Sequence, residues 1–389
     1  MEHLDGQSFD AVIVGAGPAG SSLAIRLANA RKHVLLLEKA RFPRHKMCGE
    51  FVSPECLDHF DELGVSSAIC DVSPPEYQET RFYSRNGRLL AIPNRWLSTS
   101  DRNAIGISRF ELDNLLMKRA RHCGVVVRER SEAVSAVVDA GRLVGLKVRS
   151  NGGTISEVQS VAAFDASGRA QSLARHFRSE NSAKKPGDVA FKIHASNANV
   201  EKGVCEIYSF RGGYGGCSEV ENGKFNLCFV LNSDRVRMIG NDRQAILENS
   251  VFTNRRAKEV LSDIAVGDGW LTVAIPRFGL SDSCPYPGVF AVGDAAGFID
   301  PFTGSGIALA LQTSKLCANS ILLENDLEAA AIAYQRNYSA TVSNRMRFSG
   351  AIRFLAKFPK LADQMIGLFS ISPFLSHAAA KATRYNSDR

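Results

Sequence analysis

The sequence has no paired-cysteine motif and no long apolar run. Its nine cysteines are scattered without a CxxC pair or a Cys/His cluster, which argues against a disulfide framework and a metal site. Without a run of about 18 apolar residues, we expect no transmembrane helix. The first ten residues, MEHLDGQSFD, are acidic, so we expect no signal peptide. These absences predict a protein of a reducing compartment, the cytoplasm.

Dense blocks of one charge are also missing. The net charge of +7 is spread along the chain, so we expect no nucleic-acid partner. A modest positive charge suits an acidic substrate, a phosphorylated cofactor, an anionic membrane, or simply a basic surface. The 389 residues, 45% of them hydrophobic, provide for a large core and more than one domain.

The strongest local signal is the segment FDAVIVGAGPAGSSLAIRLANARKHVLLLEKA near the N-terminus. An apolar run at 11–14 predicts a buried strand, and a GxGxxG motif at Gly15, Gly17 and Gly20 opens a helix expected over 18–30. The first glycine permits a tight turn, the second lets a pyrophosphate approach the backbone, and the third lets the helix pack closely. The pattern therefore predicts a dinucleotide site.

A second apolar run, at 34–37, ends in Glu38. A carboxylate there can accept two hydrogen bonds from an adenosine ribose and would repel a 2′-phosphate. The free N–H groups at the helix start favour a negative pyrophosphate. Ala19 and Lys39 lie beside these positions and are included in the expected cofactor site.

The next segment, RFPRHKMCGEFVSPECL, contains Arg44, Lys46, Cys48 and Gly49. It resembles the large FAD-dependent family of p-hydroxybenzoate hydroxylase, the geranylgeranyl reductases and the flavin-dependent halogenases. Within that family, RxKxCG is most similar to the geranylgeranyl reductase branch. The resemblance implies that these four residues bind FAD. Cys48 is either a redox-active thiol beside the flavin or a small buried apolar residue.

Two further segments support the resemblance. ISRFELDNLLMKRA contains Arg109 at the expected start of a helix, and the resemblance implies that this arginine contacts the cofactor. Without the resemblance, Arg109 would be interpreted as a solvent-exposed charge at a helix start. VAAFDASGRAQSLAR resembles the family's second cofactor motif, with a strand, then Asp165, Ser167 and Gly168, then a helix.

The last segment, GDAAGFIDPFTGSGIALAL, begins at Gly293. The resemblance implies that Asp294 hydrogen-bonds the ribityl chain of FAD. Gly304 and Gly306 remove side chains where the isoalloxazine edge would touch backbone N–H groups at the start of a helix over 306–323. The expected site also includes Pro301 and Ile307.

The expected fold is of the α/β (α+β) class. A Rossmann-like FAD-binding domain with a three-stranded antiparallel flap is expected from 1–72, 100–185 and 277–330, and an antiparallel-sheet substrate domain from 73–99 and 186–276. A helical stretch is expected over 243–263, and C-terminal helices over 331–389. Those C-terminal helices form a lid over a substrate tunnel, make peripheral contact with a membrane, or cover the core.

The resemblance implies an FAD-dependent oxidoreductase, with NAD(P)H or another electron donor binding transiently. We expect a monooxygenase that acts on a hydrophobic small molecule with O₂. The alternatives are a geranylgeranyl reductase-like ene reductase on an apolar alkene and a non-catalytic flavin or lipid carrier.

The motifs that would distinguish these reactions are incomplete. Tyr214 stands where the reductases have YxWxFPK, but the remaining aromatic positions differ, and the halogenase motif WxWxIP is missing. Tyr214 and Cys48 are the candidate catalytic residues, and Tyr208 and His194 are weaker candidates for a proton donor.

Overall fold

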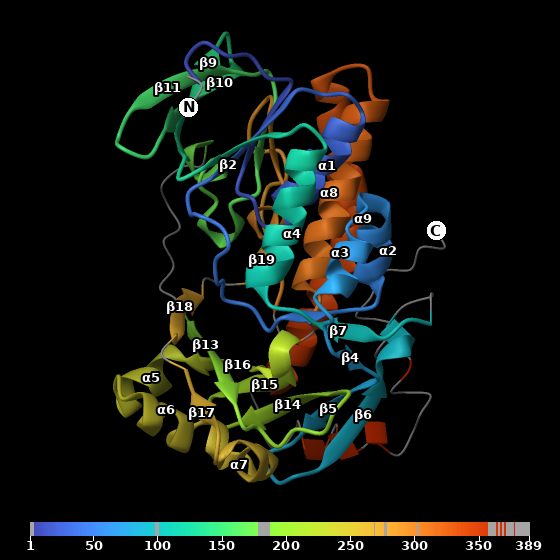
Figure 1. Cartoon of the computed structure of the whole chain (residues 1–389), viewed down its shortest axis with the longest axis vertical. Coiled ribbons are helices and arrows are strands. Elements are labelled where there is room, and N and C mark those ends of the chain that lie inside the picture. The colour runs from blue at the N-terminus through green and yellow to red at the C-terminus, as the bar shows by residue number, and fades with distance from the viewer. Residues whose placement is uncertain are drawn as a thin grey trace.

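The computed structural model describes residues 4–97, 101–177, 187–267, 269–275, 278–300, 302, 304–356, 363–364, 366–367, 369–370 and 377. A five-stranded parallel sheet stands in the upper part of the molecule (Figure 1). Its strands, in spatial order, are β20 (Val289–Ala291), β12 (Ala163–Asp165), β1 (Ala11–Val14), β2 (Val34–Glu38) and β8 (Val126–Glu129). The segments that form this sheet are far apart in the chain, as the sequence analysis predicts.

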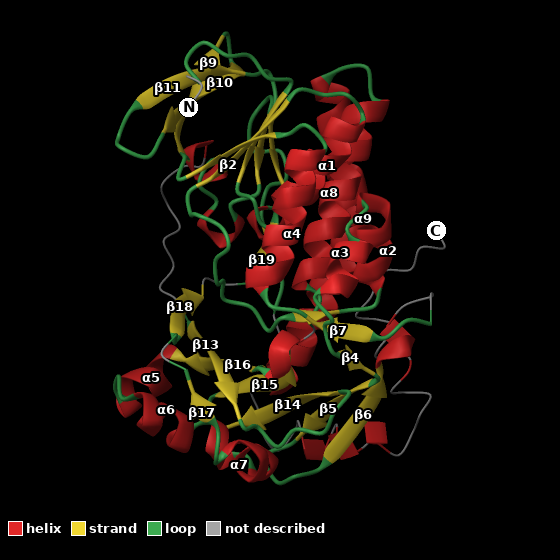
Figure 2. Ribbon diagram, viewed as in Figure 1, coloured by secondary structure: helices red, strands yellow, loops and turns green. Residues whose placement is uncertain are grey.

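Helices cover one face of this sheet and a β-flap covers the other (Figure 2). Side chains alternate along β1, so Ile13 packs towards the helices while Val12 and Val14 pack towards the flap. The helices are α1 (Pro18–Asn29), α4 (Arg109–His122), α8 (Gly306–Leu323) and α9 (Leu327–Ala356). The flap consists of β9 (Glu132–Asp139), β10 (Arg142–Arg149) and β11 (Ile155–Gln159), paired antiparallel as predicted.

A second sheet occupies the lower part of the molecule, and we call it the substrate sheet (Figure 1). Its main path is β17 (Ala265–Val266), β13 (Asp188–Ser196), β16 (Phe225–Asn232), β15 (Gly213–Glu219), β14 (Val204–Phe210), β5 (Glu79–Tyr83) and β6 (Leu89–Pro93), with β18 (Leu271–Ile275) paired to β13. Most of its pairs are antiparallel, but β14 and β5 pair in parallel because β5 enters from a distant segment.

Three short helices cover the outer face of the substrate sheet: α5 (Ser233–Ile239), α6 (Arg243–Asn249) and α7 (Arg255–Leu261). The helical stretch expected over 243–263 is present, but it consists of α6, a 3₁₀ turn at Val251–Thr253 and α7. Asn254 has extended φ and ψ angles, and its side chain accepts a hydrogen bond from the Ala257 N–H to cap α7. A capping residue of this kind begins a new helix instead of continuing the previous one.

The helix expected after Gly168 is wrong. Two short 3₁₀ turns, Gly168–Ala170 and Ala174–Phe177, occupy this part of the chain instead. The remaining elements are small and lie around the junction of the two sheets. They are β3 (Phe51–Val52), β4 (Glu76–Tyr77), β7 (Ala104–Gly106), β19 (Gly279–Leu280), β21 (Gly297–Phe298), α2 (Glu55–Leu63) and α3 (Ser66–Asp71). The domain boundaries proposed from the sequence stay a prediction.

Helix α8 begins and ends where the sequence predicts. It is long and apolar enough for a membrane span, but half of this segment is buried in the protein. It packs between α1 and α9, and Leu309, Leu311 and Cys317 belong to the main core. A packed core helix satisfies the same criteria of length and apolarity, so these criteria do not identify α8 as a membrane helix.

Asn254 joins α7 to the substrate sheet. It is fully buried, and its Nδ2 donates hydrogen bonds to the carbonyl oxygens of Ser84 and Ser209 at 3.0 and 2.9 Å. We expect Asn254→Ala to lower the free energy of unfolding by about 2–4 kcal/mol, because several buried partners lose their bonds. Chemical denaturation of the FAD-loaded protein measures this change.

The control is Asn249→Ala, which removes an exposed hydrogen bond to the Ala245 carbonyl on α6. Its expected cost is below about 0.5 kcal/mol, as for most surface substitutions. Equal effects of the two substitutions would contradict the role given to Asn254.

Candidate active site

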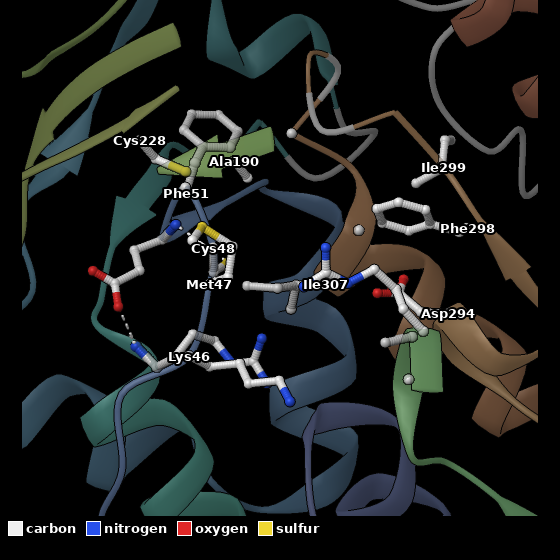
Figure 3. A pocket seen from close by; sticks show the side chains of 18 of the residues that line it. Lys46, Met47, Cys48, Phe51, Ala190, Cys228, Asp294, Phe298, Ile299 and Ile307 are labelled. Carbon is white, nitrogen blue, oxygen red and sulfur yellow. Dashed lines mark hydrogen bonds between the residues drawn. The ribbon is translucent and has the colours of Figure 1, made fainter. Parts of the chain in front are cut away.

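One cavity of about 870 Å³ lies between the parallel sheet and the substrate sheet. Gly17, Arg109, Asp294 and Gly304 come from three segments that are far apart in the sequence, and all of them line it. Figure 3 shows Lys46, Met47 and Cys48 along one wall, with Asp294, Phe298 and Ile299 across the cavity from them. The distant motifs of the sequence therefore converge on a single space.

Every cofactor-binding residue predicted from the sequence lines this cavity except Gly20, Asp165, Gly293 and Pro301, and the candidate catalytic residues Tyr214 and Cys48 line it as well. Pro301 lies outside the described residues. The individual binding roles of the lining residues stay predictions, since geometry alone shows only where they lie.

Gly20, Asp165 and Gly293 do not line the cavity, but they stabilise the backbone that forms its wall. A Cβ atom at Gly20 would collide with the carbonyl oxygen of Gly15, so close helix packing at Gly20 is confirmed. The Asp165 carboxylate accepts bonds from the N–H groups of Leu173 and Ala174 at 2.9 and 2.8 Å, and it also holds the following turn. Gly293 donates its N–H to Thr313 Oγ1 at 2.9 Å. Asp165 therefore shapes the loop and does not face a ligand.

Two arginines at the cofactor end share one buried carboxylate that the sequence analysis missed. Asp113 is fully buried on α4, and its oxygens lie 2.6 and 2.7 Å from Arg109 and 2.9 Å from Arg44. Burial opposes the charge on Arg109, but Asp113 raises the pKa of that guanidinium. The i, i+4 spacing of Arg109 and Asp113 is the sequence signal that could have revealed this pair.

Glu38 holds the glycine-rich turn against the end of β2. Its carboxylate accepts hydrogen bonds from the N–H groups of Ala16 at 3.1 Å and Ala40 at 2.9 Å. The same carboxylate lies 3.5 Å from Arg44. Its contact with an adenosine ribose stays a prediction, while its place on the cavity wall agrees with it.

Lys46 lies exposed to the cavity between these charged groups. The surrounding protein disfavours its charge, and Arg44 and Arg109 repel it, so the pKa of Lys46 falls to about 8. An anion bound in the cavity would therefore be attracted most strongly below this pH.

Asp294 and Gly304 test whether the cavity suits a flavin nucleotide. No described residue donates a hydrogen bond to the Asp294 carboxylate, and burial raises its pKa although Arg169, Arg109 and Lys46 act in the opposite direction. A hydroxyl-bearing ligand chain would supply the missing donor. Gly304 has a φ of +60°, and a Cβ there would lie 2.9 Å from Phe51 Cδ1. This glycine keeps the backbone accessible where a flat ring would lie.

A buried ion cluster joins the cofactor loop to the substrate sheet. Glu50 is fully buried and pairs with Lys192 Nζ and, at 2.6 Å, with His194 Nε2 on β13. It also accepts the Arg109 N–H at 2.8 Å. Burial opposes the charge, but His194 and Lys192 hold the pKa of Glu50 below its usual value. His194 is therefore an ion-pair partner outside the main cavity.

The two tyrosine candidates have different positions. Tyr208 is fully buried on the outer face of the sheet and donates to Glu206 at 2.8 Å, so it cannot reach the cavity. Tyr214 lines the cavity, and its hydroxyl donates to the buried Asp300 carboxylate. Cys48 lines the cavity as well, and its Sγ accepts the Glu50 N–H at 3.3 Å. Both candidate catalytic residues therefore line the cavity.

The model of the FAD binding domain family matches residues 8–321. This chain belongs to that family. The match includes all five segments that carry the predicted cofactor residues, and FAD is the cofactor of the protein. The residues present suit that assignment, as Asp294 and Gly304 show.

Several characterised proteins are similar to this FAD-binding chain. Conditioned medium factor receptor 1 of Dictyostelium discoideum is 26% identical and aligns over 97% of this chain and 77% of its own length. A menaquinone reductase of Mycolicibacterium smegmatis is 26% identical, with 79% and 75% covered. Digeranylgeranylglycerophospholipid reductase 2 of Methanopyrus kandleri is 25% identical, with 92% and 87% covered.

Among solved structures, the myxobacterial chondrochloren halogenase CndH, an FAD-dependent enzyme, superposes with a TM-score of 0.79. The identity is 23%, and 90% of this chain and 82% of the other are covered. This likeness shows the shared fold. Together with the family match, it makes this protein an FAD-dependent oxidoreductase.

Lys46 generates a pH-dependent prediction. Its charge is present below a pKa of about 8 and lost above it, so FAD affinity falls as pH rises. Between pH 7 and 9 we expect the dissociation constant for FAD to rise about tenfold, the value of one charged hydrogen bond. Fluorescence titration of the FAD-free protein measures it.

Lys46→Met should bind FAD weakly at both pH values. Lys39→Met, which removes another lysine of the same cavity, should retain the pH dependence. An unchanged pH profile in Lys46→Met would reject the assignment to Lys46.

Gly304→Val tests the backbone contact at the start of α8. A branched side chain at φ +60° is strained and meets Phe51, so we expect FAD affinity to fall at least about tenfold. The control is Gly152→Ala, also at positive φ but in the flap turn, with open space around its Cβ position. Absorbance of bound flavin after gel filtration distinguishes them, and normal flavin content in Gly304→Val would contradict the contact.

Proposed function

We propose that this FAD-dependent enzyme reduces a carbon–carbon double bond in a neutral, apolar substrate. The observation that supports it most directly is the composition of the cavity wall contributed by the substrate sheet. None of the described lining residues on that sheet is charged, and Phe82, Leu90, Ile92 and Ile207 make much of the wall apolar. The charged lining groups belong to the cofactor end.

When bound and reduced, FAD would supply a hydride to one carbon of the double bond, and a protein group would supply the proton to the other. Cys48 suits this role, because its thiol lines the cavity at the end of the cofactor loop. The apolar walls exclude water from the reacting carbons and hold the substrate chain. Arg44, Lys46 and Arg109 bind the phosphate end of the cofactor.

The relatives favour reduction over the oxygenation that the sequence analysis places first. Two of them are named as reductases, and they align over 79% and 92% of this chain. Oxygenation with O₂ is a second candidate, because β15 keeps Tyr214 but has Gly216, Cys217 and Ser218 where the Trp and Phe-Pro of the isoprenoid reductase motif would fall. A cytoplasmic location, NAD(P)H as the electron donor, and membrane contact through the C-terminal helices are also proposals. Lys357 and Lys360, two basic residues of the C-terminal region, lie outside the described residues.

The two reactions differ in their need for oxygen. We expect FAD-loaded protein, reduced under nitrogen with dithionite, to reoxidise when mixed with geranylgeraniol and to form a product two mass units heavier. Cys48→Ser should slow this step about 100-fold, as expected for loss of a general acid, while flavin content is unchanged. Stopped-flow absorbance and mass spectrometry are the measurements.

Cys70→Ser serves as the control, since Cys70 is exposed on α3 and remote from the cavity lining. A product that gains oxygen, and forms only after O₂ is admitted, would establish the second candidate instead. Binding without turnover under either gas would support a carrier.

A further inference from the structure

A helical part of the C-terminal region packs against the hairpin formed by β5 and β6. We call its described residues, 363–364, 366–367 and 369–370, the C-terminal segment. The Asp363 carboxylate accepts a hydrogen bond from Ser84 Oγ at 2.7 Å and lies 3.4 Å from Arg88 Nε. Ser84 and Arg88 lie at the two ends of the hairpin turn, and Ser84 is fully buried. In Figure 1 this segment is red and lies beside β5 and β6.

The C-terminal residues contact the hairpin before and after β6. Arg88 Nη1 lies 3.4 Å from the carbonyl oxygen of Asp363, and a Cβ atom at Gly367 would lie 2.8 Å from the same nitrogen. The backbone of the segment therefore runs directly beside this guanidinium. Further along the chain, the His377 ring meets the ring of Trp96 edge-on at 5.0 Å, and Trp96 follows β6.

Two apolar side chains of the C-terminal segment reach the main cavity. Ile366 and Phe369 are half-buried, and both line this cavity. The hairpin contributes apolar lining residues of its own, namely Phe82, Leu90 and Ile92. Because the segment is attached to this hairpin, the two together form one apolar part of the cavity wall.

This part of the wall continues from the loop that enters α8. The ring of Phe82 on β5 lies 5.6 Å from the ring of Phe302, which precedes Gly304 in that loop. Ser84, to which Asp363 is bonded, is two residues beyond Phe82. An apolar molecule with one end beside this loop would extend along Phe82 towards the C-terminal segment.

We propose that Ile366 and Phe369 determine the length of the apolar chain that the cavity accepts, and that Asp363 is the positioning residue that holds them there. The proposal rests on the proposed reduction of an apolar alkene and identifies residues that would recognise its chain. Neither side chain can form a hydrogen bond or an ion pair. They select by the space that they fill, because a packed apolar wall excludes a chain that would overlap with it.

The test compares three alcohols of increasing length: geraniol, farnesol and geranylgeraniol. Each is titrated into the oxidised, FAD-loaded protein, and binding is followed by the change in flavin absorbance. Phe369→Ala removes six carbon atoms, about the size of one isoprene unit. We expect the affinity for geranylgeraniol relative to geraniol to rise at least about tenfold, as for other pockets that discriminate by size. Unchanged flavin content and melting temperature verify the fold.

A larger side chain should act in the opposite direction. Ile366→Trp fills space in the same part of the cavity, so we expect the same affinity ratio to fall at least about tenfold. The matched control is Phe252→Ala, because Phe252 packs on the outer face of the substrate sheet and does not line the cavity. It should leave the ratio within about twofold, even if it lowers stability.

Asp363→Ala tests the positioning role. Asp363 does not line the cavity, yet its loss should raise the ratio in the same direction as Phe369→Ala, because the segment is no longer attached to Ser84 and Arg88. Asp363→Glu keeps a carboxylate and should restore most of the original ratio. Asp58→Ala, which removes an exposed carboxylate 3.3 Å from Arg102 on the surface, should leave the ratio unchanged.

An unchanged ratio in both Phe369→Ala and Ile366→Trp would overturn the proposal. Failure of all three alcohols to bind the unaltered protein would overturn it as well, since the cavity would then not accept such a chain. Turnover of the bound alcohols by the reduced enzyme is measured separately. A shifted ratio without turnover would support selection by length and reject the proposed reaction, and turnover without a shifted ratio would do the reverse.

Discussion

The arrangement of the active site depends on the buried carboxylate of Glu50. This side chain has no contact with solvent, and it bonds the backbone at the start of α4 and two basic side chains of β13 at once. An isolated carboxylate in that position would be strongly destabilising, so the surrounding donors have to be in place. The cofactor loop, α4 and the substrate sheet are thereby held in one mutual arrangement.

Asp113 has a similar role where Arg44 and Arg109 line the cavity. Its carboxylate accepts hydrogen bonds from both guanidinium groups, so these groups are already ordered before a ligand binds. Side chains that are already ordered lose little entropy on binding, which strengthens their contact with a pyrophosphate. The two carboxylates thus have different partners: Asp113 positions two arginines that line the cavity, and Glu50 connects the cofactor loop and α4 to the substrate sheet.

This division separates charge along the cavity. The charged lining residues, among them Arg44, Lys46 and Arg109, lie on the side of the parallel sheet, and the described lining residues of the substrate sheet carry no charge. Flavin chemistry needs this kind of site, because the cofactor performs the redox step. The protein positions the cofactor and substrate, provides the electrostatic field and excludes water. A triad of protein side chains is therefore unnecessary.

The sequence was most informative where the signal was local. The strand at 11–14, the helix after Gly17 and the helix over 306–323 follow from short apolar patterns and glycine spacing, and the structure has them within a residue. The three-stranded antiparallel flap was also predicted, and the structure has it. The family motifs then brought distant segments to one cavity.

What the sequence could not reveal were the partners made across the fold. Glu50 lies beside the recognised motif, yet its role depends on Lys192 and His194, more than 140 residues away. Asp165 matched a cofactor motif, but its oxygens are already occupied by backbone N–H groups of its own loop. The parallel pairing of β14 with β5 likewise joins segments whose order no local pattern encodes.

The departure of β15 from the isoprenoid reductase pattern has a physical explanation in this chain. A Cβ atom at Gly216 would lie 2.7 Å from Cδ1 of Ile207 on the neighbouring strand. The space that a side chain at Gly216 would occupy is thus already filled by Ile207, which lines the cavity. A larger side chain at Gly216 would have to displace Ile207, so this part of the cavity wall is aliphatic. The shape of an apolar wall decides which apolar molecule packs against it.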